Sequence, residues 1–216
     1  MAPPTPSRDA DRGGHGTDRG DATRRHILEV AAGAFAEHGY AGTSLNDVIR
    51  AAGVTKGGFY HHFPSKESLA LQVVRYKQDQ WAGRVMASAM RQTRAVDQLR
   101  AMPEALVDLH EEDHSTESLG KLCMELSENR DLAPELMGQF ITWIDLTSAL
   151  VAKAQQEGDI RPDVDPGMAG ELAVCAFVGL EELSRSVSGS TDLRERVRRV
   201  FDVLFTLFRP TEAANH

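Results

Sequence analysis

The sequence has little of what would point to a secreted, metal-bound or membrane-embedded protein. It contains only two cysteines, Cys123 and Cys175, which lie far apart in the chain. This spacing fits neither a zinc motif nor a disulfide framework and suits a reducing cytosol. No apolar run approaches the roughly 18 residues needed to span a bilayer, and Arg24-Arg25 is not followed by an apolar targeting segment. We therefore expect a cytoplasmic protein with no metal, cofactor or membrane partner.

Signatures of most enzymes are also missing, because the chain shows no Ser-His-Asp arrangement and no glycine-rich phosphate loop. One catalytic motif does occur, since residues 110–114 satisfy H-E-x-x-H. On a helix, His110 and His114 would share a face and bind zinc, with Glu111 as general base. No third ligand is identifiable, and the segment has the composition of a solvated, acidic helix end. We expect no enzymatic activity and keep a zinc hydrolase as a remote alternative.

Apolar residues recur at helical spacing along most of the 216-residue chain, and no window alternates as strands do. The pattern therefore predicts an all-α protein. Residues 1–20 are rich in Pro, Gly, Asp and Arg, so they cannot bury enough apolar surface to offset ordering, and we expect a disordered arm. Asp21 is the expected cap of the first helix. Helices are predicted at 22–38, 45–52, 56–62, 66–90, 94–113, 116–129, 132–157, 166–188 and 191–208.

The stretch from Thr43 to Lys66 predicts two short helices joined by a tight turn. Ser44 and Thr55 are suited to cap the two helices through their hydroxyl groups. Gly53 allows a positive φ between them, and Pro64 ends the second helix. This arrangement is a helix-turn-helix, whose second helix can enter the major groove of DNA.

The second of these helices has an unusual composition, with Lys56, Tyr60 and His61 around the adjacent pair Gly57-Gly58. Each glycine costs about 1 kcal/mol relative to alanine in a helix, so the pair suggests the close approach of another backbone, such as a sugar-phosphate chain. Two other interpretations stay open at this point. The segment could be a plain surface turn, or the chain could be a partner-binding helical module without affinity for DNA.

The run ILEVAAGAFAEHGYAGTSLNDVIRAAGVTKGGFYHHFPSKESLALQVV resembles the DNA-binding half of TetR-type transcriptional repressors. The resemblance implies an all-helical homodimer that binds a palindromic operator in double-stranded DNA and is released by a small molecule bound in its C-terminal half. We expect Lys56 to contact a base edge, with Gly57 allowing close approach. Phosphate contacts are expected from Thr43, Ser44, Thr55, Tyr60, His61 and Lys66.

The net charge of −8 at first argues against a DNA-binding protein. Residues 21–70, however, hold five Lys or Arg and five Asp or Glu, together with four histidines. The acidic excess lies in the C-terminal remainder, where it would keep DNA away from the wrong face. A neutral DNA-binding half predicts modest non-specific affinity.

The predicted helices 132–157 and 166–188 carry apolar arcs that are too wide for helices with one wet face. A packed core explains this, and so does a cavity for an apolar ligand with a few orienting polar groups. For a cavity, the candidate lining residues are Gln80, Trp81, Trp143, Thr147 and Phe177.

The stretch from Met124 to Val197 is similar to the γ-butyrolactone receptor branch of TetR proteins, notably in its EGDIRPDVDP loop, AFVG segment and DLRERV ending. This resemblance implies a small hydrophobic signal of γ-butyrolactone, butenolide or furan type, control of antibiotic biosynthesis genes, and a pocket tryptophan at Trp143. Many members have a threonine where this chain has Val178. The alternative is a pseudo-receptor that responds to an antibiotic or another hydrophobic ligand.

The last two predicted helices are expected to form the homodimer by pairing as a four-helix bundle. We assign to this interface Leu172, Ala173, Ala176, Gly179, Leu180 and Leu183, with Val197, Val200, Phe201, Leu204, Phe205 and Phe208. The expected organisation is an arm at 1–20, a DNA-binding domain at 21–70, and a ligand-binding and dimerisation domain at 71–216.

Overall fold

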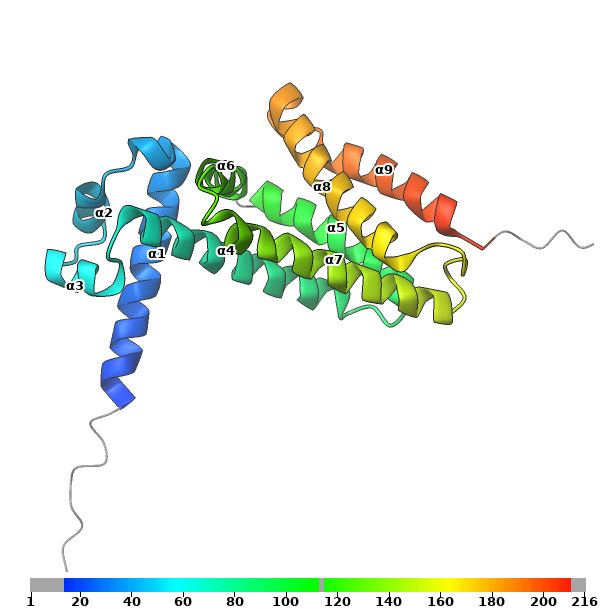
Figure 1. Cartoon of the computed structure of the whole chain (residues 1–216), viewed down its shortest axis with the longest axis horizontal. Coiled ribbons are helices and arrows are strands. Elements are labelled where there is room, and N and C mark those ends of the chain that lie inside the picture. The colour runs from blue at the N-terminus through cyan, green and yellow to red at the C-terminus, as the bar shows by residue number, and fades with distance from the viewer. Residues whose placement is uncertain (1–13, 113–114, 211–216) are drawn as a thin grey trace, which may run out of the picture. The chain divides into compact units, whose positions relative to one another are not determined.

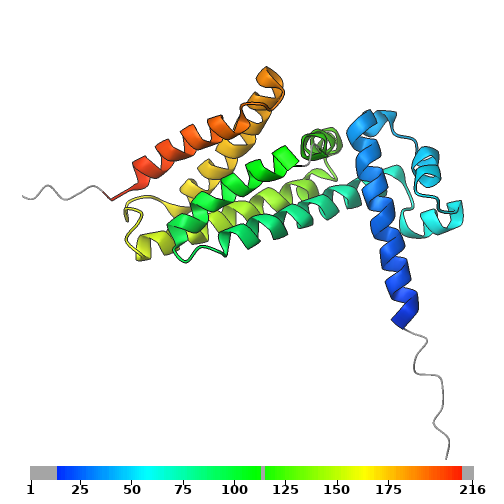
Figure 2. The same cartoon turned by 180° about the vertical axis from the view of Figure 1, so that it is seen from behind.

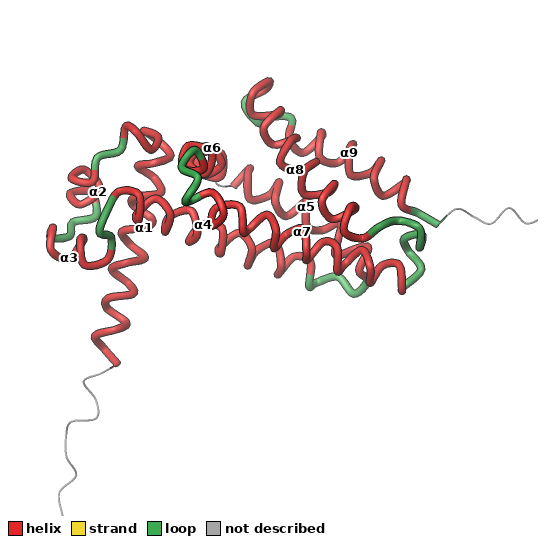
Figure 3. Tube along the Cα trace, viewed as in Figure 1, coloured by secondary structure: helices red, strands yellow, loops and turns green. Residues whose placement is uncertain are grey.

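The computed structural model describes residues 14–112 and 115–210, and over these residues the chain contains helices and loops but no strand (Figure 3). The all-α prediction is therefore confirmed. Within the same residues the helices are α1 (Gly14–Gly42), α2 (Leu45–Ala51), α3 (Lys56–His62), α4 (Lys66–Ala89), α5 (Ala95–Glu112), α6 (Ser115–Ser127), α7 (Ala133–Gln156), α8 (Pro166–Ser188) and α9 (Leu193–Phe208) (Figure 1). In the part of the chain so described, no helix is long and apolar enough to cross a membrane.

The chain divides into two compact units, Met1–Tyr76 and Lys77–His216. The division falls inside α4, which begins in the first unit and continues into the second. This point lies a few residues beyond the boundary expected between residues 70 and 71.

The first unit is built around a fully buried aromatic pair, Phe59 and Phe63, whose rings lie 5.6 Å apart. Ile27 and Leu28 of α1 and Leu69 of α4 are also fully buried. Phe59 and Phe63 are four positions apart, so the short helix α3 buries one side, and this burial is what keeps such a short helix in place.

Helix α1 begins at Gly14, well before the expected start at Ala22 with Asp21 as its cap. The prediction of a disordered arm is therefore wrong for residues 14–20, and residues 1–13 lie outside the described part. Once the packed part of a helix has formed, each added residue gains a hydrogen bond at little cost, so polar residues can extend it. Gly39, with φ 70° and ψ 175°, interrupts the helix where a break was expected.

The second unit contains α5 to α9 together with the later turns of α4. Helix α7 packs most extensively against α8, and α5 contacts α7, α9 and α6. Helices α8 and α9 lie side by side in both views (Figures 1 and 2). A Cβ added at Gly170 of α8 would lie 2.8 Å from the carbonyl oxygen of Ile144, so this glycine sets the close approach of α7 and α8.

Charged side chains fix α9 at its N-terminal end. The Arg194 guanidinium donates to Asp108 and Glu111 at 2.7 Å and to Glu104 at 3.2 Å, all on α5. Asp192 accepts from Ser184 and Ser188 of α8 at 2.6 Å and from Arg196 at 2.7 Å. These bonds hold α9 against both α5 and α8.

Candidate functional site

The α2–turn–α3 segment has the expected helix-turn-helix geometry within the first unit. The turn contains Gly53 with φ 65°, and Thr55 caps α3 by accepting from the backbone N–H of Gly58 at 3.1 Å. Ser65 caps α4 in the same way, accepting from Ser68 at 3.0 Å. The cap expected from the Ser44 hydroxyl is wrong, because its side chain makes no cap bond. The Ser44 carbonyl instead accepts from Asp47 and Val48.

Helix α3 buries one side and presents the other to solvent. Phe59 is fully buried, while Tyr60 is 46% exposed and packs edge-on against the Phe59 ring. The residues expected to contact DNA that lie on the exposed surface of α2 and α3 are Ser44, Thr55, Lys56, Gly57, Tyr60 and His61. The structure therefore gathers cationic, hydroxyl and imidazole donors on one short helix and its cap.

Gly57 and Gly58 differ in what surrounds them. A Cβ at Gly58 would lie 3.2 Å from the Thr55 hydroxyl, against the cap bond of α3. A Cβ at Gly57 would meet nothing within 4 Å. Packing within the chain thus explains why position 58 is glycine. It does not explain the exposed glycine at position 57.

Thr43 has a structural role that conflicts with its expected phosphate contact. It is 3% exposed, and its hydroxyl lies 2.7 Å from the carbonyl oxygen of Gly39 and 3.1 Å from that of Ala34. It closes the irregular end of α1, so its side chain cannot reach a phosphate without leaving its buried position. This is a correction to the sequence-based assignment.

Lys66 is half-buried and held within the first unit. Its ammonium group lies 4.6 Å from the centre of the Tyr40 ring and donates to the Ala41 carbonyl at 3.3 Å. Tyr40 in turn stacks on Phe35. Lys66 is therefore fixed at the start of α4, with three donors of which these contacts use only part.

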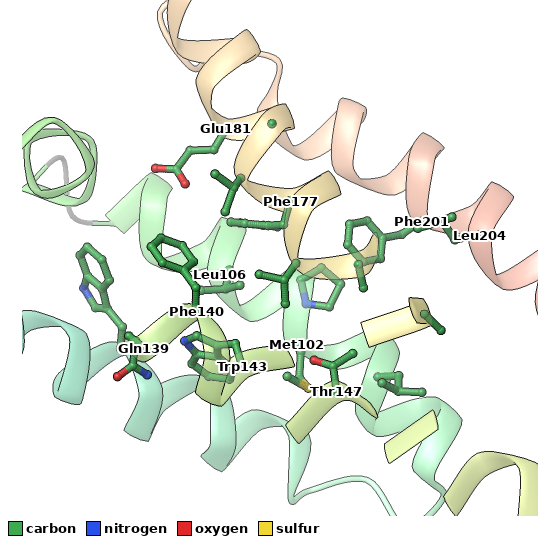
Figure 4. A pocket seen from close by; sticks show the side chains of 18 of the residues that line it. Met102, Leu106, Gln139, Phe140, Trp143, Thr147, Phe177, Glu181, Phe201 and Leu204 are labelled. Carbon is green, nitrogen blue, oxygen red and sulfur yellow. The ribbon is translucent and has the colours of Figure 1, made fainter. Parts of the chain in front are cut away.

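The second unit encloses a cavity of about 500 Å³, a size typical of small-molecule sites. Figure 4 shows Gln139, Trp143 and Thr147 of α7 on one wall and Phe177 and Glu181 of α8 across from them. Met102 and Leu106 of α5 and Phe201 and Leu204 of α9 contribute further surface. Within each helix these residues are three or four positions apart, so each helix turns one stripe toward the cavity.

Four of the five expected lining residues do line the cavity: Trp81, Trp143, Thr147 and Phe177. The fifth, Gln80, is exposed, and Gln78 lines the cavity in its place. Two residues along a helix correspond to a rotation of about 200°, so Gln78 and Gln80 face nearly opposite sides. The assignment of Gln80 is wrong for that reason. Val178 also lines the cavity.

Sequence reasoning missed the polar pair formed by His110 and Glu181. His110 Nε2 lies 2.9 Å from Glu181 Oε1, and its Nδ1 lies 2.9 Å from the Leu106 carbonyl oxygen. Cys123 also lines the cavity, and burial raises the pKa of its thiol to about 12, with a further contribution from the negative charge of Glu181. In the sequence His110 stands out only as part of the H-E-x-x-H pattern, and nothing there pairs it with Glu181.

Several residues assigned to the dimer interface pack inside their own chain, whereas Leu172 and Leu183 of the same set are exposed. Val197, Phe201 and Phe205 are buried in the core of their own chain, together with Leu99 and Phe177. Their assignment to the interface is a correction, because the strongest apolar stripe of α9 faces inward. The large apolar residues that remain exposed on α8 and α9 are Met168, Leu172, Val178, Leu183, Val187, Val203 and Leu207.

Comparison with known proteins follows this division of the molecule. Residues 27–73 match the family model "Bacterial regulatory proteins, tetR family", and residues 122–210 match "Tetracyclin repressor-like, C-terminal domain". The regulator RutR of Escherichia coli O157:H7 is 33% identical over 147 residues, which are 67% of each chain. The chain belongs to the TetR family.

Further similar proteins include a receptor protein and a solved structure. The A-factor receptor protein of Streptomyces griseus is 26% identical over 184 residues, which cover 83% of this chain and 61% of the receptor. A solved structure described as the molecular basis for control of antibiotic production by bacterial hormones is 30% identical with a TM-score of 0.76. The match covers 88% of this chain and 98% of that one.

Membership in the TetR family makes this chain a DNA-binding transcriptional repressor and not an enzyme. The H-E-x-x-H pattern has no support in the structure. His110 contacts Leu106 and Glu181, while His114 lies outside the described residues. Within residues 14–112 and 115–210, no three metal-ligating side chains are grouped to hold an ion.

Proposed function

We propose that this TetR repressor binds a palindromic operator as a homodimer and is released by a small apolar signal of γ-butyrolactone, butenolide or furan type. We further propose that it controls antibiotic biosynthesis genes. In this proposal residues 21–70 bind DNA, and residues 71–216 bind the ligand and form the dimer. The observation that carries the proposal is the apolar cavity walled by Trp81, Trp143, Thr147 and Phe177. The similarity to the A-factor receptor protein and to a structure described in terms of antibiotic production and bacterial hormones supports the signal class.

The DNA contacts in this proposal come from α3 and the residues around it. Lys56 contacts a base edge, most favourably guanine O6 or N7. Gly57 lets the DNA backbone approach, because the space beside it is open. Ser44, Thr55, Tyr60, His61 and Lys66 position the helix on phosphates.

Dimerisation in this proposal uses the exposed apolar residues of α8 and α9. Leu172 and Leu183 are 47% and 46% exposed, Val187 is 67% exposed, and Val203 and Leu207 are 57% and 59% exposed. An apolar surface of this kind is typical of a protein interface. Two copies related by a two-fold axis would present two α3 helices to successive major grooves.

Release requires the ligand to favour a form whose half-site spacing no longer fits the operator. A ligand shifts the equilibrium only by its differential affinity for the two forms. Helix α4 is suited to transmit the change, because it carries Lys66 in the first unit and the cavity residue Trp81 in the second.

The test is a gel-shift titration against DNA from upstream of the protein's own gene, followed by butyrolactones, butenolides, furans and antibiotics. Release by one of the first three classes is the expected result. Release by an antibiotic alone would favour a pseudo-receptor, which Val178 in the cavity wall makes the second candidate. A folded dimer that binds no operator would contradict the proposal.

Two glycine variants separate DNA contact from folding. Gly33 of α1 and Gly57 of α3 are both exposed, and an added Cβ meets nothing within 4 Å at either. Both alanine variants should fold as well as the parent, because alanine favours helix by up to about 1 kcal/mol. Gly57→Ala should weaken operator binding by about tenfold or more, a loss of at least about 1.4 kcal/mol, while Gly33→Ala should bind normally. Equal operator binding by both variants would contradict the proposed contact between α3 and DNA.

A further inference from the structure

The cavity wall contains two adjacent glutamates of α8 that differ in their surroundings. The Glu182 carboxylate also borders the cavity, but it already accepts from Arg185 and Ser186 of its own helix. Glu181 is 25% exposed and extends from the same helix face as Phe177 toward the space across from α7 (Figure 4). Glu181 is thus the carboxylate that a ligand in the cavity would meet.

His110 holds Glu181 in this position. The His110 side chain is only 8% exposed, and the Phe177 ring packs against it at 6.1 Å. Because a carbonyl oxygen only accepts, the 2.9 Å contact with Leu106 places a proton on His110 Nδ1. Nε2 lies 2.9 Å from Glu181 Oε1. This contact restrains one oxygen of the carboxylate, and the other oxygen keeps its acceptor lone pairs.

The surroundings of Glu181 amplify its effect on a ligand. Its negative charge contributes to the raised pKa of the Cys123 thiol, so its field reaches across to α6. Gly120 of α6 lies close enough for an added Cβ to sit 3.7 Å from Glu181 Oε1. The cavity lining is largely apolar, so a polar group left unpaired against it is costly.

We propose that Glu181, positioned by His110, selects ligands by the charge of their polar end. The cavity accepts apolar molecules that end in a hydroxyl or ammonium group and rejects those that end in a carboxylate. A donor satisfies the acceptor lone pairs of Glu181, whereas a second carboxylate adds like charge without a donor. This inference rests on the proposed function, because it takes the cavity to be the ligand site.

Tryptophan fluorescence tests the inference without DNA. The chain has two tryptophans, Trp81 and Trp143, and both line the cavity, so quenching reports cavity occupancy directly. The probes are 1-decanol, decylammonium and decanoate at pH 7.5, which share a chain length and differ in the charge of the polar end. In the parent protein, decanoate should bind at least about tenfold more weakly than the other two.

Glu181→Gln removes the charge and keeps the size of the side chain. Decanoate should then gain roughly tenfold in affinity and decylammonium should lose roughly tenfold, with 1-decanol changed by less than about threefold. Asp145→Asn is the matched control, because Asp145 lies on the cavity-forming helix α7 and is exposed outside the cavity. This control should leave all three affinities unchanged.

Three outcomes would overturn the inference. A common shift of all three probes in Glu181→Gln would mean that Glu181 only packs. Opposite shifts of decanoate and decylammonium in Asp145→Asn would mean that net charge acts at a distance. Failure of the folded parent to bind any probe would show that the cavity does not take this ligand class. A protein that shows the charge selectivity but does not release its operator would contradict the proposed function alone.

Discussion

The two units of this repressor use apolar side chains in opposite ways. In the first unit, Phe59 and Phe63 meet in a core with the fully buried Ile27 and Leu28 of α1 and Leu69 of α4. In the second, Phe140 and Trp143 line a cavity of about 500 Å³. A filled core keeps the exposed hydrogen-bond donors of α3 in a fixed arrangement. A surface that must match the shape of DNA needs such a fixed arrangement. A unit with a cavity gives up part of its packing, and so it can respond to what enters.

The largest effect that would test this contrast is the loss of one phenylalanine from each unit. Phe59→Ala should reduce the free energy of unfolding by about 3–5 kcal/mol, because it empties a fully buried position. Phe140→Ala should cost about 1 kcal/mol or less, because Phe140 is half-buried and already borders empty space. Urea unfolding followed by circular dichroism measures both. Equal losses would mean that the cavity wall is as tightly packed as the core.

The second unit is close-packed at one point, where α7 crosses α8 at Gly170. Gly170→Ala should destabilise the protein by about 1–3 kcal/mol, because the added methyl would press on the Ile144 carbonyl and the Ser148 backbone. Gly138→Ala in α7 is the control, since its Cβ would meet nothing within 4 Å. Thermal unfolding should show a lowered Tm for the first variant and an unchanged or raised Tm for the second. The reverse order would place the tight contact elsewhere.

Helix caps provide a smaller test within the first unit. Thr55→Ala should cost about 1 kcal/mol, because it removes the hydroxyl that accepts from Gly58. Ser44→Ala should have almost no effect on stability, because the Ser44 side chain makes no cap bond. Chemical denaturation of the two variants beside the parent gives the comparison. A cost at position 44 as large as that at position 55 would show that Ser44 caps α2 in solution.

The smallest expected effect is a change in thermal stability at low pH that depends on Asp192 in the second unit. Hydrogen bonds from Arg196, then from Ser184 and Ser188, hold the pKa of Asp192 well below its usual range. A carboxylate with a lowered folded-state pKa stabilises the fold above its ordinary value near 4 and loses that contribution as the pH falls. The Tm gap between the parent and Asp192→Asn should therefore be present at pH 7 and narrow steadily below about pH 4.

Asp202→Asn is the control for this acid effect, since Asp202 makes only a 3.8 Å ion pair with Arg100. Its Tm should follow that of the parent at every pH. A gap for Asp192→Asn that stays constant down to pH 2 would contradict the assigned role of Asp192.

Local patterns were enough to predict the helices and the α3 surface. The Thr55 cap and the positive φ of Gly53 follow from residue type and position alone. Thr43 could not be placed in the same way, because its burial depends on the irregular path of the chain at Gly39. The extension of α1 to Gly14 was missed for a related reason, since composition does not show how far a helix continues beyond its packed part.

The sequence predicts the wide apolar arcs of the two helices α7 and α8. It does not predict whether those arcs enclose a cavity or pack into a core. Periodicity places Trp143 and Thr147 on one stripe of α7, whereas it cannot show whether that stripe meets another helix or a void. The contact between His110 and Glu181 joins α5 to α8. Such a pair depends on how the helices cross, which a single sequence does not reveal. The same limit explains why Val197 and Phe201 were assigned to an interface when they pack inside their own chain.

In the proposed release mechanism, helix α4 would act as a lever. Residues Lys66 and Trp81 lie on one uninterrupted helix, and at 1.5 Å of rise per residue they are separated by about 22 Å along its axis. Pivoting this rod by about 5° at the Trp81 end would carry the Lys66 end sideways by roughly 2 Å. That displacement is comparable to the tolerance of a hydrogen bond to phosphate. In the proposed mechanism, a tilt small enough to leave the cavity walls nearly intact would therefore be magnified, by length alone, into a misfit at the DNA.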